Sequence, residues 1–462
     1  MSFHREGKKS QCLGGAVCIV LILGVASPSF SQSVRPCGPP QRDDPNAAAL
    51  KAQTTASKPA SKLGEWELVP SLCVSERYDS NVFFSTSATH DYVTHVAPKV
   101  LVKHAGEYAS GTLEATGMNE TYARNPGLNF LGGGGTLSLS LDRTIKRFLP
   151  NASFGITDSV RYTPLPPSFV NPVAGTSPID PINAQDAFAR GVIAFRTNTF
   201  SNTGGANLAY MISPRVNIDF AYSSALTRYG SSDLQRSVQA QLFDITSHTG
   251  SMGGNIRISE SDTLNARYSF VDTKFRSADT GVAGLSTTPR IDAAFQTHTG
   301  LLGWSRVFTP YLKSQLAGGV VLVDPGLISW SMNAELLFIN PTYPVTLTYS
   351  RSAFPSILGQ ATPVIGNTVS LSASQRLSSD WQLAETANFS QSNGATASND
   401  SGSNRLRFTT YRATVDLYYW MTRVWAAALS YDYMKFDSEF GSGRSFSFDR
   451  HAMTLGVKAT WE

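Results

Sequence analysis

Apolar and polar residues alternate along most of the chain after Trp66. The alternation is clearest in residues 328–338, 409–419 and 424–436. There one face is mostly aromatic and aliphatic, and the other carries mainly Ser, Thr, Asn, Asp, Glu and Arg. A period of two indicates a β-strand whose two faces meet different surroundings. The pattern therefore predicts a nearly all-β chain.

A soluble β-sandwich also alternates, but three features favour a membrane barrel. Aromatic residues lie towards the strand ends, ionisable residues lie in mid-strand on the opposite face, and short connections alternate with long ones. The short connections centre on Pro214, Ser261, Pro310, Ser379 and Thr422, and the long ones cover residues 163–187, 230–243, 276–291, 392–405 and 437–447. We expect an all-β, transmembrane, antiparallel up-and-down β-barrel with short periplasmic turns and longer extracellular loops.

The strand runs number about 18, with 16 as the alternative, because bacterial barrels have an even number of strands. The runs begin near residues 66, 91, 108, 134, 150, 190, 216, 244, 263, 293, 311, 327, 343, 364, 381, 406, 424 and 450. Residues 188–213 are long for one simple strand, so a hairpin at residues 201–205 is an open alternative.

The composition suits strands that face lipid on one side and water on the other. Charged residues make up 16% of the chain, against roughly 25% in typical globular proteins. Aromatic residues reach 11%, and there are 37 glycines. The formal net charge is only +4, so nothing in it points to nucleic acid as a partner.

The N-terminal residues are typical of a secretion signal. Basic residues precede an apolar segment, residues 12–26, and small residues follow before Gln32. The apolar segment is short for a spanning helix, which needs about 20 residues; an uncleaved anchor helix is the alternative. We expect location in the bacterial cell outer membrane. The expected organisation is a signal peptide over 1–31, a flexible periplasmic tail over 32–64 and a barrel over 65–462.

Two of the four cysteines precede the expected cleavage point, and Cys37 and Cys73 follow it. In the oxidising periplasm these two could form a disulfide that closes the tail onto the first strand. Two free thiols are the alternative.

The first two predicted strands contain the segment ERYDSNVFFSTSATHDYVTHVAPKVLV, residues 76–102. Its order is aromatic-Asp-x-Asn-apolar, a polar loop, an acidic residue and a strand through proline. In this order it resembles the start of the beta-barrel porin family of type 2, bacterial outer-membrane barrels often associated with exopolysaccharide systems. The matching positions are Tyr78, Asp79, Asn81, Asp91 and Pro98. Because Asp and Asn readily bond nearby backbone groups, we interpret the motif as a rim corner at the end of the first strand.

The last run, HAMTLGVKATWE, is an alternating strand with an aromatic residue near its end. Leu455, Val457 and Trp461 share its apolar face, which resembles the signal read by the barrel assembly machinery. The departure is that Glu462, not the aromatic residue, is last. An ordinary edge strand is the alternative, although barrel closure requires the last strand to pair with the first.

No catalytic or metal-binding motif accompanies the strands. The sequence contains no Gly-x-Ser-x-Gly elbow, no His-Glu-x-x-His and no Cys-x-x-Cys. We therefore expect no enzymatic activity, no metal and no cofactor.

Ionisable residues at inward positions are more informative. By alternation, the interior should receive Asp219, Arg267, Lys313, Glu335, Arg412, Asp416, Asp432 and Lys458. One interpretation is a polar channel whose charges set solute preference. The other is a filled lumen in which these charges pair and brace the wall. Barrels of 16–18 strands usually leave water inside, which favours the channel.

We therefore expect a porin-like passive channel for small polar solutes, with assistance in exopolysaccharide export as a further role. The first alternative is a structural or adhesive barrel that makes contact through its loops at 163–187 and 392–405. A hydrolase is the remote alternative. The expected partners are outer-membrane lipid and lipopolysaccharide, the barrel assembly machinery and polysaccharide export components.

Overall fold

The described part of the chain is a β-barrel of 18 strands. The computed structural model describes residues 66–165, 197–229, 243–277, 293–324, 326–340, 342–355, 363–394, 407–440 and 444–461. The expected signal peptide and periplasmic tail lie outside these residues.

The strands all run 11 to 17 residues. They are β1 (Trp66–Asp79), β2 (Asp91–Ala105), β3 (Ser110–Tyr122), β4 (Phe130–Ser140), β5 (Ala152–Leu165), β6 (Thr197–Ser213), β7 (Val216–Tyr229), β8 (Phe243–Arg257), β9 (Asp262–Ser277), β10 (Ala293–Thr309), β11 (Leu312–Val323), β12 (Leu327–Phe338), β13 (Val345–Pro355), β14 (Pro363–Arg376), β15 (Trp381–Gly394), β16 (Arg407–Trp420), β17 (Trp425–Phe440) and β18 (Arg444–Thr460). The described helices are η1 (Pro126–Leu128) and α2 (Asp142–Ile145). No helix in the described ranges is long and apolar enough to cross a membrane.

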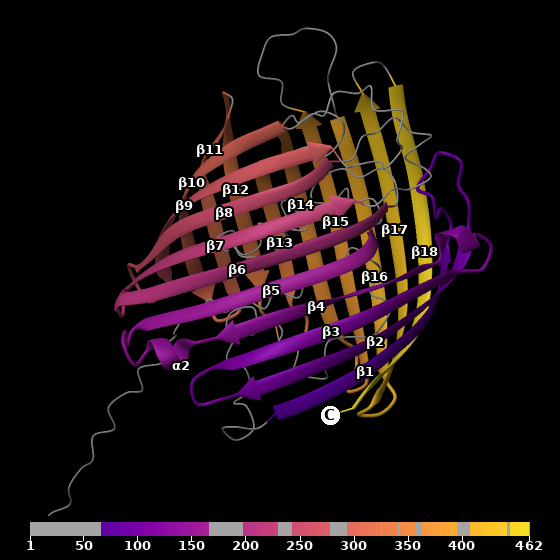
Figure 1. Cartoon of the computed structure of the whole chain (residues 1–462), viewed down its shortest axis with the longest axis horizontal. Coiled ribbons are helices and arrows are strands. Elements are labelled where there is room, and N and C mark those ends of the chain that lie inside the picture. The colour runs from indigo at the N-terminus through magenta and orange to yellow at the C-terminus, as the bar shows by residue number, and fades with distance from the viewer. Residues whose placement is uncertain are drawn as a thin grey trace, which may run out of the picture.

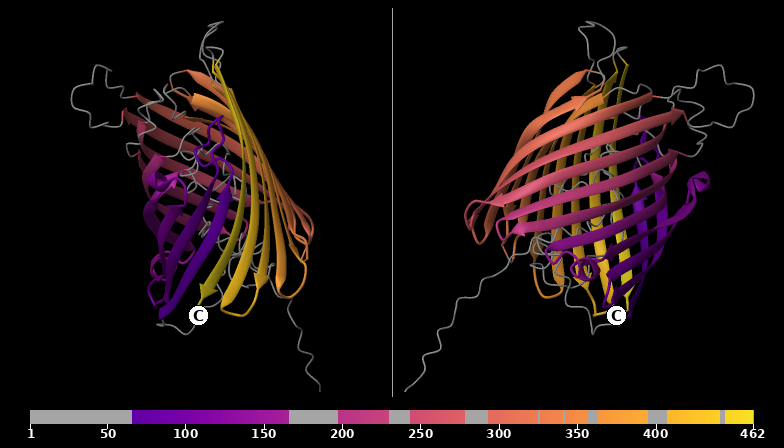
Figure 2. Two further views of the ribbon diagram at one scale, coloured as in Figure 1. Left: turned by 90° about the vertical axis from the view of Figure 1, so that its right-hand side faces the viewer. Right: turned by 60° about the vertical axis from the view of Figure 1, so that its left-hand side comes forward.

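Every strand pairs antiparallel with the next one along the chain, and β1 also pairs with β18 (Figures 1 and 2). This last pairing, which we call the seam, runs from Ser71 opposite Thr460 to Asp79 opposite Ala452. It closes the sheet, so no strand edge is left with unpaired backbone groups. The expected antiparallel barrel is confirmed, with 18 strands and not 16. β6 is continuous through residues 201–205, so the alternative of a hairpin there is wrong.

The exterior of the barrel is apolar. The most exposed aliphatic side chains include Leu131, Leu302 and Ile328, at 76%, 72% and 71% exposure. On each strand they alternate with buried residues, as a period of two requires. In a soluble protein these side chains would be buried. Their exposure all round a closed sheet therefore indicates a surface that meets lipid.

The interior is rich in small hydroxyl residues. Buried inward side chains include Ser223, Ser247, Thr249, Thr368, Ser370, Ser390, Thr410, Ser430 and Thr454. Buried apolar clusters also lie there, among them one around Phe275 and Phe295 and another around Phe408, Phe436 and Phe448.

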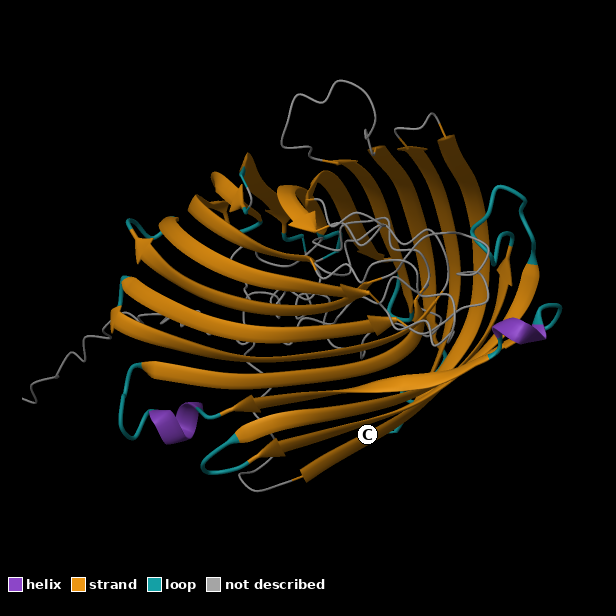
Figure 3. Cartoon of the chain, turned by 45° about the horizontal axis from the view of Figure 1, so that its top comes forward, coloured by secondary structure: helices purple, strands orange, loops and turns teal. Residues whose placement is uncertain are grey.

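The two ends of the barrel differ in their connections. At one end, the turn end, residues 214–215 join β6 to β7 and residues 310–311 join β10 to β11. The opposite end, the loop end, includes the connection of residues 80–90, although the turn end has one connection of equal length, residues 141–151, which contains α2. Figure 3 shows the strands running between the ends, with little helix.

The prediction of a long loop at residues 437–447 is wrong. β17 and β18 extend into it and leave only residues 441–443 between them. Phe436, Phe446 and Phe448 pack together on the inner surface, which stabilises the pairing close to the strand ends. The other four expected long loops lie largely outside the described residues.

Candidate functional site

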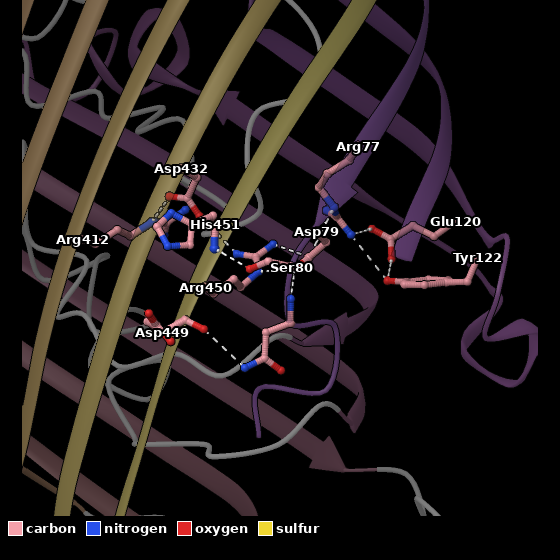
Figure 4. A network of polar contacts seen from close by, with 11 residues as sticks. Arg77, Asp79, Ser80, Glu120, Tyr122, Arg412, Asp432, Asp449, Arg450 and His451 are labelled. Atoms are coloured by element: carbon pink, nitrogen blue, oxygen red, sulfur yellow. Dashed lines mark hydrogen bonds and ion pairs between the residues drawn. The ribbon is translucent and has the colours of Figure 1, made fainter. Parts of the chain in front are cut away.

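A row of paired charges crosses the interior beside the seam (Figure 4). We call it the charge ladder. It consists of Arg412 on β16, Asp432 on β17, Arg450 on β18, Arg77 and Asp79 on β1, and Glu120 and Tyr122 on β3. Alternation explains its composition, because each of these side chains occupies an inward position of its strand.

The centre of the ladder is the pair Asp79 and Arg450. Arg450 donates from Nε to Asp79 Oδ1 at 2.9 Å and from Nη2 to Oδ2 at 2.6 Å. Two parallel hydrogen bonds between a guanidinium and a carboxylate form the strongest and most directional kind of ion pair. Both residues are buried, at 2% and 6% exposure. The pair therefore links the first and last strands through side chains as well as through the backbone.

On the β17 side, Asp432 bridges two arginines. Arg450 Nη1 donates to its Oδ2 at 3.1 Å, and Arg412 Nε donates to its Oδ1 at 2.7 Å. Thr414 Oγ1 also donates to Oδ1, at 3.0 Å. The side chain of Asp432 is fully buried. Burying a carboxylate costs free energy unless it is paired and hydrogen-bonded, and these contacts meet that condition.

On the β3 side, Arg77 continues the ladder with looser contacts. Its Nε lies 3.7 Å from Asp79 Oδ2, and its Nη2 lies 3.9 Å from Glu120 Oε1. Tyr122 donates its hydroxyl hydrogen to Glu120 Oε2 at 2.9 Å. The three guanidinium groups of the ladder thus face three carboxylates, and its formal charge is zero.

The loop after β1 is hydrogen-bonded to the charge ladder and to β18. Asn81 donates its backbone N–H to Asp79 Oδ1 at 3.1 Å, and its side-chain amide donates to the carbonyls of Ser85 and Asp449. Phe84 adopts φ 52°, a left-handed conformation that a bulky side chain rarely takes. Its ring is buried against Phe448, and the Arg450 guanidinium lies 5.1 Å from its centre. The packing of Phe84 holds this strained conformation in place.

A second buried ion pair lies on the far wall. Arg267 on β9 donates from Nη2 to Asp219 Oδ2 on β7 at 2.5 Å. The strand between them contributes Gly253, which stands opposite both residues. A Cβ at Gly253 would lie 2.8 Å from Asp219 Oδ1 and 2.9 Å from Arg267 Nη2. Glycine therefore allows this pair to form across β8.

The structure brings some of the expected lumen residues together and separates others. Arg412 and Asp432 share the charge ladder, and Asp219 pairs with Arg267. The remaining ones lie at other inward positions: Lys313 on β11, Glu335 on β12, Asp416 on β16 and Lys458 on β18.

The five positions of the rim motif do not form one site. Asp79 and Asn81 are buried at the ladder. Asp91, at the start of β2, accepts hydrogen bonds from the backbone N–H groups of Arg124 and Asn125 and so fastens the next loop. Tyr78 and Pro98 lie on the outer face. The motif is therefore a corner of the wall, as its sequence suggests.

The residues of the expected assembly signal lie on or just after β18, and Cys73 lies on β1, the other strand of the seam. Leu455, Val457 and Trp461 are exposed, and the backbone N–H of Trp461 donates to the carbonyl of Pro70 on β1 at 3.0 Å. Cys73, on the inner face of β1, takes part in a disulfide. Cys37 lies outside the described residues, so its pairing with Cys73 stays a prediction.

Four members of the ladder were missed by sequence reasoning: Arg77, Glu120, Tyr122 and Arg450. Arg77 has the same inward alternation as Asp79, and Arg450 the same as Lys458. The last strand was expected to begin at Arg450, and it begins six residues earlier, at Arg444. Alternation within the expected first strand already placed Arg77 inward, and the observed bounds of β18 would have placed Arg450 there too.

The contacts of the charge ladder hold neighbouring strands together. Its arginines are already paired, and its acidic groups accept from them. Among the described residues, no group of three His, Cys, Asp or Glu side chains could hold a metal ion.

The comparisons with known proteins give no family. No family model and no curated protein matches the chain. Solved structures do resemble it. The siderophore receptor PirA from Acinetobacter baumannii has 9% identity and a TM-score of 0.45, over 87% of this chain and 81% of the receptor. OccK3 (OpdO) from Pseudomonas aeruginosa has 12% identity and a TM-score of 0.44, over 86% and 96%. OccK2 (OpdF) from the same organism has 10% identity and a TM-score of 0.45, over 85% and 98%.

The closed sheet, the apolar exterior and the polar interior define the architecture of this chain. It is a porin-like β-barrel of the bacterial outer membrane.

Proposed function

We propose that the protein is a passive channel for small polar solutes. The observation that carries this proposal is the inner surface, where hydroxyl side chains line a closed sheet of 18 strands. Barrels of 16–18 strands usually enclose water, and a wall rich in hydroxyl groups is polar, as a water-filled lumen requires. No step of such a mechanism requires a reaction, so the proposal includes no enzymatic activity.

The pairing of the inner charges supports weak preference between cations and anions. The charge ladder has no net charge, and Asp219 compensates Arg267. Two further inward pairs, Lys99 with Glu114 and Lys103 with Glu67, are also matched. Fixed charges that cancel locally produce little net potential along a pore.

A second candidate is a structural barrel with a filled lumen. It is favoured by the low exposure of the inner wall, where Thr410, Ser430 and Asp432 are each at most 1% exposed. Proteoliposome swelling separates the two. Vesicles that contain the folded barrel should swell in an isotonic solution of a small neutral sugar, whereas protein-free vesicles should not. A folded barrel that causes no swelling would exclude the channel and favour the structural role.

The two more specific proposals, on family membership and on exopolysaccharide export, rest on the rim motif alone. Its similarity to the type 2 porin family supports membership of that family and a role beside exopolysaccharide export. Deleting the gene and measuring secreted polysaccharide tests the second point. Unchanged secretion would exclude the export role and leave the channel unaffected.

A further inference from the structure

The same pair of side chains recurs on the outer face of four hairpins in the described part of the barrel. The pairs are Tyr78 with His90, Tyr222 with His248, Tyr268 with His298, and Tyr431 with His451. In each, the tyrosine belongs to a strand that runs towards the loop end, and the histidine is the last residue of the next loop or lies on the strand that follows it. The histidine lies two positions nearer the loop end than the residue opposite the tyrosine.

The four pairs have nearly the same spacing between their rings. Their ring centres are 6.2, 6.3, 6.2 and 6.3 Å apart, in chain order. In the last three, the tyrosine Oη lies 2.9, 2.7 and 2.8 Å from histidine Nδ1. Strand pairing fixes which positions are diagonal neighbours, but it does not choose the residues. The recurrence therefore calls for a function shared by the four places.

All four pairs lie at a boundary on the outer surface. Towards the turn end, the neighbouring outward side chains of three pairs are apolar, as with Phe220 below Tyr222 and Leu429 below Tyr431, whereas Glu76 lies below Tyr78. Towards the loop end, charged side chains begin. Tyrosine at such a boundary matches the aromatic girdle where a barrel leaves the hydrocarbon. The histidines thus lie at the level of the lipid headgroups.

Basic residues stand beside three of the pairs. Arg124 contacts the ring nitrogen of His90 and stacks on Tyr92. Lys274 lies one outward position nearer the loop end than the residue opposite His248. Lys435 holds the corresponding place beside His451. The side chains of Lys274 and Lys435 are 65% and 47% exposed, and their Nζ atoms lie 3.7 and 3.9 Å from the carboxylates of Asp272 and Asp437.

The chemistry of the pairs favours an acceptor-rich ligand. A tyrosine hydroxyl that donates to Nδ1 leaves the proton of a neutral imidazole on Nε2, at the opposite edge of the ring. Each of the three hydrogen-bonded pairs then offers an N–H donor at headgroup level, and Arg124 supplies the donor beside His90. With the neighbouring cations, these donors match phosphate groups attached to lipid.

We propose that the four Tyr–His pairs form a collar that binds phosphorylated lipid headgroups of the outer leaflet. This inference does not depend on whether the barrel conducts. It predicts that phosphate on the lipid stabilises the barrel, and that the histidines account for much of that effect.

The test uses the full-length protein in phosphatidylcholine vesicles that contain either diphosphorylated lipid A or the same lipid without its phosphates. The readout is the midpoint temperature of the heat-induced shift in gel migration. Wild type should have the higher midpoint with phosphorylated lipid A. The variant with His90, His248, His298 and His451 all changed to Phe should lose at least half of that difference.

The matched control is His104→Phe. His104 is also an outward histidine, but it lies at the turn end and stacks on Trp66 with ring centres 4.1 Å apart. This variant should keep the full difference. If the fourfold histidine variant does not fold, the fourfold Tyr→Phe variant replaces it, because it removes only the hydroxyl groups. Wild type indifferent to the phosphates, or a collar variant as responsive as wild type, would overturn the proposal.

Discussion

Arg450 on the last strand donates two hydrogen bonds, of 2.9 and 2.6 Å, to the carboxylate of Asp79 at the end of the first strand. The two residues are 371 positions apart in the sequence. They meet only because β1 and β18 pair, so this contact exists only in the closed barrel.

Removing one partner of this pair should destabilise the barrel strongly. Asp79→Asn leaves the Arg450 guanidinium buried without its main counter-charge, and losing one member of a buried pair costs roughly 3–5 kcal/mol. Urea unfolding in lipid vesicles, followed by tryptophan fluorescence, measures this. The control is Glu107→Gln, whose partner Arg147 is exposed; that change should cost less than about 1 kcal/mol. Equal losses in the two variants would contradict the role of the pair.

A double variant separates the pair from its surroundings. Asp79→Asn combined with Arg450→Gln should lose less free energy of unfolding than the sum of the single changes, because neither partner is then left as an unpaired buried charge. Strictly additive losses would mean that the two side chains act independently.

Gly253→Ala should disturb the second ion pair. The new Cβ would displace both Asp219 and Arg267, and we expect a loss of roughly 1–3 kcal/mol in the free energy of unfolding. Gly250→Ala on the same strand is the control, since a Cβ there meets nothing within 4 Å. In an Asp219→Ala background, the loss of unfolding free energy caused by Gly253→Ala should be much smaller. If that cost is unchanged, the glycine serves some other purpose.

Phe84 should stabilise the barrel although its backbone is strained. Phe84→Ala removes a ring that is 5% exposed from the cluster with Phe436 and Phe448, a change that costs roughly 3–5 kcal/mol at buried sites. Phe148→Ala, at a ring that is 79% exposed, should leave the unfolding midpoint unchanged. A Phe84→Ala barrel as stable as wild type would show that the ring is dispensable.

The remaining cysteines should be oxidised in the mature protein. Cys73 takes part in a disulfide, and Cys37 is the other cysteine that follows the expected cleavage point. Under denaturing conditions a thiol reagent should therefore modify neither residue until a reductant is added, as mass spectrometry of tryptic peptides would show. Modification of both before reduction would reject the disulfide.

Much of the fold could be predicted because alternation is a local property. β7, β12 and β15 begin at residues 216, 327 and 381, where the alternating runs begin. The same alternation places Asp219 and Arg267 on one face. Partners across strands are a different matter, because register depends on the whole sheet and not on any one segment. For that reason neither the Asp79–Arg450 pair nor the diagonal Tyr–His pairs could be found from one sequence.

The wrong prediction of a loop at residues 437–447 also has a physical cause. Residues 437–447 contain Gly and Ser, which suggested a loop, but the phenylalanines on either side pack inside the barrel and extend both strands. Packing contacts between distant residues outweighed the local turn signal. Phe84 is a further case, since its left-handed backbone depends on a pocket formed by β16, β17 and β18.

Single-channel recording in planar bilayers tests the central claim most directly. Purified barrel that shows heat-modifiable migration should produce stepwise currents, with a reversal potential near zero in a salt gradient because the charge ladder and the Asp219–Arg267 pair each carry no net charge. The same folded preparation giving no current steps would contradict the proposal that this barrel is a channel.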